Sequence, residues 1–277
     1  MTRKYLALFI LLTSSILTVD NTTACTVFSS FQGNIALVGN NEDGKYSTDV
    51  EIWFASPSGG KFGRVCFGWK QLLFFKQAQG GMNDQGLFFD WALCPKSDPP
   101  KFSFHKKTAT FSMPESLLSE CATVEEAIEW LEHYNILFIR SHIMLADRTG
   151  NSAVVEWVDG KMNVIQKSGN YQIITNFWLS HPELGNYPCP RYNIAMEMLT
   201  ATESISVEHV SSILKQTSQH DPTGKGKYGT IYSNIYDLTN GNISIYYKQD
   251  FDHPYEINLN EELKKGKHSY KLESLFE

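Results

Sequence analysis

The sequence predicts an α+β domain in which sheets are covered by helices. Many short segments have strand character and are separated by turn residues, whereas few segments have helical periodicity. The chain has no internal repeat and no low-complexity linker, and residues 25–277 are long enough for one large domain with a sizeable core. A long run of strands interrupted by a few helices is typical of such layered domains.

Residues 1–24 have the features of an export signal. This segment has two basic residues at positions 3 and 4, continues with a largely apolar stretch at 5–17 and ends on the small residue Ala24, directly before Cys25. The apolar stretch is shorter than the roughly 20 residues of a transmembrane helix. We therefore expect cleavage after Ala24, a periplasmic or secreted protein, and no stable membrane insertion afterwards. The alternatives are an uncleaved membrane anchor and a lipid-modified Cys25.

The composition limits the classes of molecule that the protein is expected to bind. The formal net charge is −6 and no run of basic residues occurs, which argues against nucleic acid as a partner. Aromatic residues make up 13% of the chain, a share that suits an apolar binding pocket but serves a core equally well. We expect a small-molecule substrate, and a homo-oligomer remains among the open options.

The cysteine count points to one unpaired thiol. An odd number of cysteines in an exported protein leaves one without an intramolecular partner, and Cys25 is the natural candidate. The other four are either disulfide-bonded or buried thiols, and their pairing stays open. They are Cys66, Cys94, Cys121 and Cys189.

Ten segments have alternating or β-branched and aromatic patterns that predict strands. They are residues 25–30, 34–39, 50–55, 63–69, 86–91, 142–147, 153–158, 171–175, 230–238 and 244–248. Two of the connections that follow these segments carry turn sequences: Asp-Gly at residues 159–160 and Asn-Gly within residues 239–242. Such turns predict hairpin connections.

Helices are predicted at three places. Thr123 and Glu126 form a capping box at the start of residues 124–133, which have apolar positions at helical spacing. Residues 191–199 and 207–214 are also expected to be helical, the first of them directly after a proline.

A cysteine at a predicted cleavage point permits a particular chemistry. A free α-amino group has a pKa of roughly 7.7–8.0 and a thiol one of roughly 8.5, so Cys25 can supply both base and nucleophile. The reaction also needs donors for an oxyanion and a carboxylate near the amine. Asp43 ends the second strand of the hairpin that Cys25 begins, Asn176 follows a strand, and Arg191 opens a helix.

At this point the chain resembles a known family. It is similar to the N-terminal-nucleophile hydrolases of the penicillin V acylase and bile salt hydrolase (choloylglycine hydrolase) group, within the broader linear-amide C–N hydrolases. The matching motifs cover nearly all of residues 25–277 and occur in the family's order. They are C-T at 25–26, G-N-N-E-D at 39–43, G-M-N-D-Q-G-L at 81–87, A-D-R-T-G-N-S-A-V-V-E at 146–156, T-N at 175–176, P-R-Y at 190–192 and T-I-Y-S at 230–233.

The resemblance implies a fold and a set of roles. The fold is a four-layer αββα sandwich of the N-terminal-nucleophile hydrolase type. Cys25 is then the nucleophile, Asp43 holds the α-amine, Asn176 is an oxyanion donor and Arg191 supports the charge of the site. No metal and no organic cofactor are implied.

Two departures weaken assignment to penicillin V or bile salts as substrates. The family has an arginine three residues before its aspartate, and here that position is Asn40. The family's second oxyanion residue is matched by residues 91–93, Trp-Ala-Leu, so backbone N–H groups would have to supply part of the oxyanion hole. For substrate contact we single out the aromatic residues Trp69, Trp91 and Phe177, which suit a bulky apolar acyl group.

Each candidate also has a structural alternative. Asp43 and Asn176 could instead be ordinary turn residues. Arg191 could instead be an arginine that merely stands at the start of a helix. Three further motif residues are expected to be structural, with the last two shaping a hairpin: Asn83, Asp147 and Glu156.

The predicted function is an exported cysteine amidase that cleaves a linear N-acyl amide through a thioester. One alternative is an acyltransferase of the same fold that passes the acyl group to an amine. A second is a lipid-anchored binding protein without catalysis. Neither the acyl chain nor the leaving amine follows from the sequence.

Overall fold

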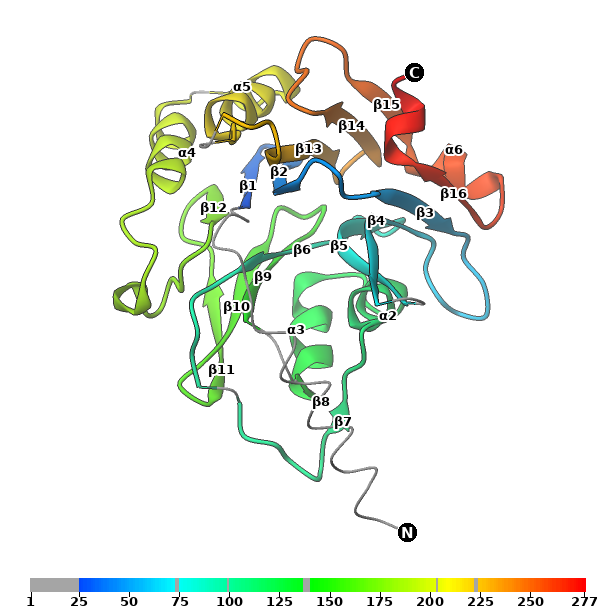
Figure 1. Cartoon of the computed structure of the whole chain (residues 1–277). Coiled ribbons are helices and arrows are strands. Elements are labelled where there is room, and N and C mark those ends of the chain that lie inside the picture. Colours follow the sequence, from blue (N-terminus) through cyan, green and yellow to red (C-terminus); the bar gives the residue numbers. More distant parts are fainter. Residues whose placement is uncertain (1–24, 73–74, 99, 137–139, 203, 222–223) are drawn as a thin grey trace.

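A computed structural model describes residues 25–72, 75–98, 100–136, 140–202, 204–221 and 224–277; the expected signal segment lies outside these residues. The described chain forms four layers. Two helices cover a six-stranded sheet, an eight-stranded sheet packs against its other face, and two more helices cover the far side (Figure 1). This is the predicted αββα arrangement.

The six-stranded sheet contains the N-terminal hairpin. Neighbouring strands are all antiparallel, and β13 has an irregularity between Thr230 and Tyr232 where it pairs with β2. In spatial order its strands are β12 (Tyr171–Ile174), β1 (Thr26–Gln32), β2 (Ile35–Lys45), β13 (Tyr228–Asp237), β14 (Asn242–Tyr247) and β15 (Tyr255–Asn258).

The eight-stranded sheet is also antiparallel throughout. Its strands are, in spatial order, β11 (Lys161–Gln166), β10 (Ser152–Val158), β9 (Ser141–Ala146), β6 (Phe88–Leu93), β5 (Phe75–Asn83), β4 (Arg64–Leu72), β3 (Glu51–Ala55) and β16 (His268–Lys271). Two short strands, β7 (Lys107–Thr108) and β8 (Tyr134–Asn135), pair in parallel outside it.

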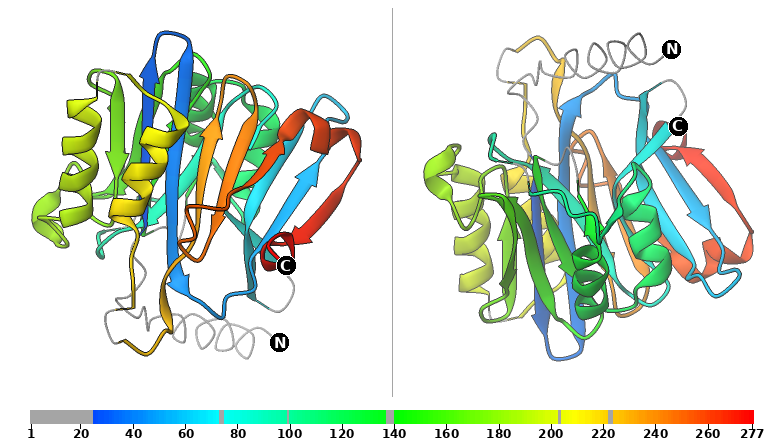
Figure 2. Two further views of the ribbon diagram at one scale, coloured as in Figure 1. Left: turned by 90° about the horizontal axis from the view of Figure 1, so that it is seen from above. Right: turned by 90° about the horizontal axis from the view of Figure 1, so that it is seen from below.

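The helices cover the outer faces of the two sheets. Figure 2 shows α4 (Pro190–Ala201) and α5 (Val207–Thr217) over β1 and β2 in one view, and α2 (Met113–Glu120) and α3 (Val124–Glu132) over the other sheet in the opposite view. The remaining helical segments are α6 (Leu259–Lys264), η2 (Pro182–Leu184) and η3 (Leu272–Leu275).

The predicted cap of α3 is confirmed. The Thr123 hydroxyl accepts a hydrogen bond from the Glu126 N–H at 3.2 Å, and the Glu126 carboxylate accepts one from the Ala122 N–H at 2.6 Å. The first contact satisfies a backbone donor that the first turn of a helix leaves free, and the second reaches back to the residue before the N-cap.

Strand alternation decides which side chains face which layer. On β1 and β2, Val27 and Val38 join the core between the sheets, whereas Phe28 and Leu37 pack under α4 and α5. Cys25 belongs to the core between the sheets. The N-terminal nucleophile candidate is thus placed in the interior of the sandwich.

All ten predicted strands and all three predicted helices are found, but several elements were missed. The missed strands include β5, β11, β15 and β16, and the missed helices are α2 and α6. In β5 the sequence F-K-Q-A-Q-G-G-M-N has few strand-forming residues, and pairing with β4 and β6 holds it in place. The second strand was also predicted too short, because β2 continues to Lys45 through the motif that contains Asp43.

Candidate active site

Cys25 lies directly before β1, buried between the two sheets with 6% of its surface exposed. Its Sγ is 3.7 Å from Oε1 of Glu42. Burial, followed by the charges of Glu42 and Asp43, raises the pKa of the thiol well above its usual value, and a backbone hydrogen bond from Asp43 opposes this. The thiol is therefore neutral at rest and needs a base in order to attack.

Arg191 ties the start of β1 to the loop after β12. It stands in the first turn of α4, just after Pro190. One guanidinium nitrogen donates to the Cys25 carbonyl at 2.6 Å and to the Thr26 hydroxyl at 2.7 Å, and the other donates to Oδ1 of Asn176 at 3.0 Å. The reading of Arg191 as a plain helix-start arginine is wrong, because its fork joins two segments of the site.

Asn176 is held in one orientation. Because its Oδ1 accepts from Arg191, its amide nitrogen points the other way and donates to the Leu93 carbonyl at 2.9 Å. Its backbone carbonyl accepts from Asn186 at 2.8 Å. These contacts use one of the two amide hydrogens. Asn176 stands in a bend after β12, as the turn-residue alternative expects, and its side chain is also held on both sides.

Asp43 lies within β2, so the turn-residue reading is wrong for it too. Its Oδ1 accepts a short hydrogen bond from the Thr230 hydroxyl across the β2–β13 pair. Burial raises the pKa of Asp43 to about 7, although Arg191 and Thr230 act to lower it. A carboxyl group with this pKa gains or loses its charge near neutral pH, which is also the pH range in which a neighbouring α-amine would titrate.

Two carboxyl groups that the motifs did not single out also face the core near Cys25. Glu42 is 4% exposed and Asp90, on β6, is 1% exposed. Burial and the charge of Asp43 raise the pKa of Glu42 to about 8, and burial followed by the charge of Glu42 raises that of Asp90 well above its usual value. Asp90 could have been found from its inward place in the apolar strand F-F-D-W-A-L.

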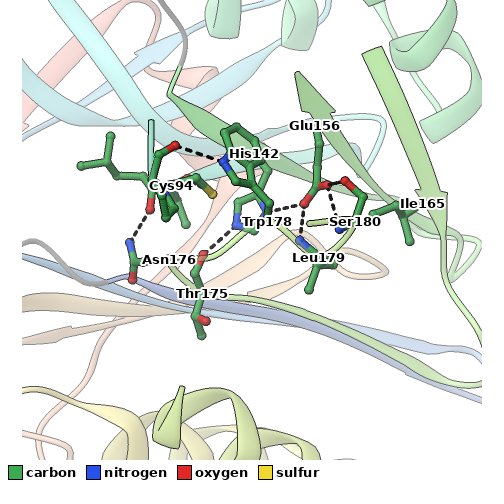
Figure 3. Close-up of polar contacts among 12 residues, drawn as sticks. Cys94, His142, Glu156, Ile165, Thr175, Asn176, Trp178, Leu179 and Ser180 are labelled. Carbon is green, nitrogen blue, oxygen red and sulfur yellow. Dashed lines mark hydrogen bonds and ion pairs between the residues drawn. The ribbon is translucent and has the colours of Figure 1, made fainter. Parts of the chain in front are cut away.

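His142 forms a fully buried ion pair with Glu156 (Figure 3). Its Nδ1 is 3.1 Å from Oε1 of Glu156 and its Nε2 is 2.6 Å from the Thr175 carbonyl. A carboxylate and a carbonyl only accept, so both ring nitrogens donate and the imidazole is charged. Burial lowers the pKa of His142, but Cys94 and Glu156 raise it to about 10. His142 is therefore unsuited to act as a general base.

Glu156 fixes the loop that presents Asn176. Its carboxylate accepts from the Leu179 N–H at 2.6 Å and from the Ser180 N–H at 3.1 Å and hydroxyl at 2.5 Å (Figure 3). Burial acts to raise the pKa of Glu156, but His142 and Ser180 outweigh it and the pKa is lowered. The expectation that Glu156 mainly shapes a hairpin was incomplete, because its side chain holds residues 175–180 in place.

The other two motif residues are structural, as expected. The Asp147 carboxylate accepts from the backbone of Thr149 within the turn and from the N–H of Val124, which begins α3. Asn83 donates to the carbonyls of Leu118 and Cys121, while its Oδ1 accepts from the N–H groups of residues 85 and 87. Both residues join turns to the helical layer.

The aromatic residues chosen for substrate contact are not brought together. Trp69 packs against the core between the sheets. Trp91 packs on the opposite face of β6, under α2 and α3, and its indole N–H donates to Gln79 at 2.9 Å. Phe177 is 3% exposed and packs against two tyrosine rings. The choice of Trp91 was wrong for the space that contains Cys25, because strand alternation turns its side chain away.

The described residues contain no disulfide: all five cysteines are unpaired buried thiols. Within the same residues, no three His, Cys, Asp or Glu side chains are grouped so that they could hold a metal ion. No helix of the described chain is long and apolar enough to cross a membrane.

Comparison with known proteins places this arrangement in a family. Residues 30–251 match the family described as acyl-coenzyme A:6-aminopenicillanic acid acyl-transferase. The chain belongs to this family. It is 31% identical over 110 residues to a penicillin V acylase of Pectobacterium atrosepticum, a match that covers 35% of the chain and 29% of that protein. The chain thus spans under a third of this curated relative's length.

Solved structures confirm the fold of this family member. Conjugated bile acid hydrolase from Clostridium perfringens superposes with a TM-score of 0.74 at 19% identity, covering 89% of this chain and 97% of the other. Penicillin V acylase from Agrobacterium tumefaciens superposes with a TM-score of 0.71 at 20% identity, and the match covers 90% of this chain and 92% of the other. Together with the family match, these relatives confirm the predicted group of N-terminal-nucleophile hydrolases.

Proposed function

We propose that the protein is an exported cysteine amidase that cleaves a linear N-acyl amide through a thioester. The observation that carries this proposal is the Arg191 fork, which joins the Cys25 carbonyl to the Asn176 side chain. A buried thiol, a fixed amide donor and a carboxylate beside them meet the needs of acyl transfer. The printed names of the relatives, penicillin V acylase and conjugated bile acid hydrolase, support an amide substrate.

The proposed reaction begins with removal of residues 1–24, which frees the α-amine of Cys25. The amine takes the thiol proton, Sγ bonds to the amide carbon, and the carbonyl oxygen becomes an oxyanion that accepts from Asn176. Collapse breaks the C–N bond, and the ammonium returns its proton to the leaving amine. Water, deprotonated by the α-amine, then cleaves the thioester to release the acid and restore the thiol.

Asp43 and Arg191 have supporting roles in this scheme. Asp43 stabilises the ammonium that forms when the amine accepts the proton, and its pKa of about 7 keeps it partly ionised near neutral pH. Arg191 aligns the Cys25 carbonyl and Asn176, so that the sulfur and the oxyanion donor act on one carbonyl group.

The second candidate is an acyltransferase with the same thioester. The observation in its favour is the matched family itself, whose description names an acyl-transferase. Here an amine instead of water attacks the thioester, and the product is a new amide. Incubating the enzyme with an N-acyl amide and a second amine distinguishes the two: free acid as the main product supports the hydrolase, and a new amide supports the transferase.

The decisive experiment concerns what precedes Cys25. The exported protein should begin at Cys25 with a free amine, which the mass of its N-terminal peptide reports. A form with Gly-Ser kept before Cys25 should fold but be inactive, because the extension turns the amine into an amide and removes the base. Cys25→Ala should be inactive, and Asp43→Asn should lose most turnover while remaining folded.

Two results would overturn the proposal. Full activity of the extended form would show that the α-amine is not the base. An acylated Cys25 in the membrane fraction, together with no hydrolysis of any N-acyl amide, would instead support the lipid-anchored binding protein.

A further inference from the structure

The proposed mechanism leaves one side-chain contact of the nucleophile unused. Oε1 of Glu42 lies 3.7 Å from Sγ of Cys25, within the range of a hydrogen bond that involves sulfur, and both side chains are buried. A buried carboxyl group beside a nucleophilic sulfur affects its charge whichever protonation state it adopts.

The position of Glu42 follows from the alternation of β2. Val38 faces the core between the sheets, and Glu42, four residues further along the same strand, points to the same side as Cys25. Asp43, the next residue, points to the opposite side, where it meets Thr230. The two consecutive acids therefore serve different spaces, and Glu42 is the one that faces the sulfur.

The opposite sheet provides a second acid that faces the same space. On β6, Phe88 and Ala92 join the core between the sheets, so Asp90 between them points inward as well. Its strand partner is Gly80, and a Cβ at that position would lie 2.2 Å from Oδ2 of Asp90. The glycine leaves room for the carboxyl of Asp90 to lie over β5.

Few partners act to keep these acids ionised: hydrogen bonds with Cys25 and Asn40 lower the pKa of Glu42, and one with the backbone of Trp91 lowers that of Asp90, but burial outweighs them. Oε2 of Glu42 and Oδ1 of Asp90 have no hydrogen-bond partner in the described part of the chain, and neither has the hydroxyl of Tyr232, which pairs with Glu42 across the strands. An unpaired buried carboxylate is costly, so the neutral form is favoured. The groups that shift the pKa of Glu42 include the neighbouring Asp43 and the Cys25 thiol, and none of them is a cation.

We propose that Glu42 is a further catalytic residue: in its neutral form it donates a hydrogen bond to the Cys25 thiolate, and its ionisation suppresses that thiolate. This inference rests on the proposed role of Cys25 as nucleophile. No bond is made or broken by Glu42, whose proton stays on its own oxygen while the thiol proton goes to the base.

The inference gives the nucleophile an unusual response to pH. An ordinary thiol reacts faster as the pH rises, because more of it becomes thiolate. Here rising pH also ionises Glu42, whose pKa is about 8, and replaces a donor by a negative charge beside the sulfur. The charged and polar groups that act on Glu42 from the same space are Cys25 before β1, Asn40 on β2, Asp90 on β6, and Tyr232 and Tyr236 on β13, and the charge of Asp43 acts from the opposite side of β2. The reactivity of Cys25 should therefore flatten or fall in alkaline solution.

The test measures the thiol directly and needs no substrate. The purified protein is treated with iodoacetamide between pH 6 and 9.5, and the rate of Cys25 alkylation is followed by mass spectrometry of its peptide. Glu42→Gln keeps an N–H donor but cannot ionise. It should react within about threefold of the unchanged protein at pH 6.5 and at least about tenfold faster at pH 9.5.

A second pair of variants keeps the test valid if Glu42→Gln folds poorly. Glu42→Leu removes the donor and should slow alkylation at pH 6.5 by about tenfold. Asp90→Asn is the matched control: burial and the charge of Glu42 raise the pKa of Asp90 well above its usual value, so Asp90 is neutral when Glu42 ionises, and the flattening should begin at the same pH as in the unchanged protein. Circular dichroism and urea unfolding of each variant report whether it is folded.

The outcomes are separable from those of the proposed function. Parallel pH profiles for Glu42→Gln and the unchanged protein would overturn the role of Glu42, even if the protein hydrolyses amides. Hydrolysis that survives in Cys25→Ala would overturn the proposed function, whatever the alkylation rates show.

Discussion

Two buried glutamates face the space between the sheets and differ in their partners. Glu156 accepts hydrogen bonds from His142, from two backbone N–H groups and from the Ser180 hydroxyl, whereas Glu42 contacts the Cys25 sulfur and has one unpaired oxygen. The pKa of Glu156 is lowered and that of Glu42 is raised to about 8. Glu156 is therefore ionised at neutral pH and Glu42 is neutral, although both are buried, because the partners decide which form is stable.

This difference separates a structural role from a responsive one. Glu156 and His142 keep complementary charges over the neutral pH range and hold the loop that carries Asn176. Glu42 changes charge near its pKa, next to the group that would react. Four predictions test this contrast, from the largest expected effect to the smallest.

Glu156→Gln should destabilise the protein by about 3–5 kcal/mol, because it leaves the buried His142 charge without its counterion. The free energy of unfolding at pH 7, from urea denaturation, measures the loss. Glu42→Gln is the matched control, with the same substitution in the same core, and should cost nothing or stabilise. Similar losses in the two variants would mean that the contrast between them is wrong.

Asn176→Ala should lower kcat/KM by about 10²–10³-fold, the usual effect of removing one oxyanion donor. The stability should change far less than in Glu156→Gln, because the hydrogen bonds that hold the loop remain. Steady-state kinetics on a hydrolysed N-acyl amide, with urea unfolding in parallel, separate the two effects. An unchanged kcat/KM would remove Asn176 from the proposed machinery.

The pH dependence of stability should have opposite signs in the two glutamate variants. The folded-state pKa of Glu42 is raised above its ordinary 4.5, so its contribution is fully present below that pH and is lost as the pH rises toward about 8. Glu42→Gln should therefore gain stability over the unchanged protein across this window, by about 1.4 kcal/mol for each pH unit between the two pKa values.

Glu156 should show the reverse. Its folded-state pKa is lowered, so its contribution is present above the ordinary value of 4.5 and is lost as the pH falls through the lowered one. The deficit of Glu156→Gln should shrink in acid. Unfolding curves at pH 4, 6 and 8 test both variants, and slopes of the same sign would contradict the assigned charges.

The smallest effect is expected for Ser180→Ala. It removes one of several hydrogen bonds to Glu156, and a bond to a charged group contributes about 1–2 kcal/mol. The ion pair with His142 and the two backbone contacts remain. The same unfolding assay measures the loss of stability. A loss as large as that of Glu156→Gln would show that the Ser180 hydroxyl is the main stabilising contact of Glu156.

Local patterns were enough to predict much of the fold. Alternation located β1 and β13, and the capping residue Thr123 located the start of α3, because each depends on neighbours in the sequence. The family resemblance supplied the order of the site residues. Sequence patterns did not predict β5 and α2, because the positions of these elements depend on the elements against which they pack.

The sequence by itself determined the αββα class and the candidate set Cys25, Asp43, Asn176 and Arg191. Tertiary structure decided how these residues meet, since Arg191 contacts Cys25 across 166 positions of chain and no local pattern encodes that distance. It also decided that Glu42 faces the sulfur. Alternation states that two neighbouring residues face opposite ways, but the packing of the second sheet decides which way is inward.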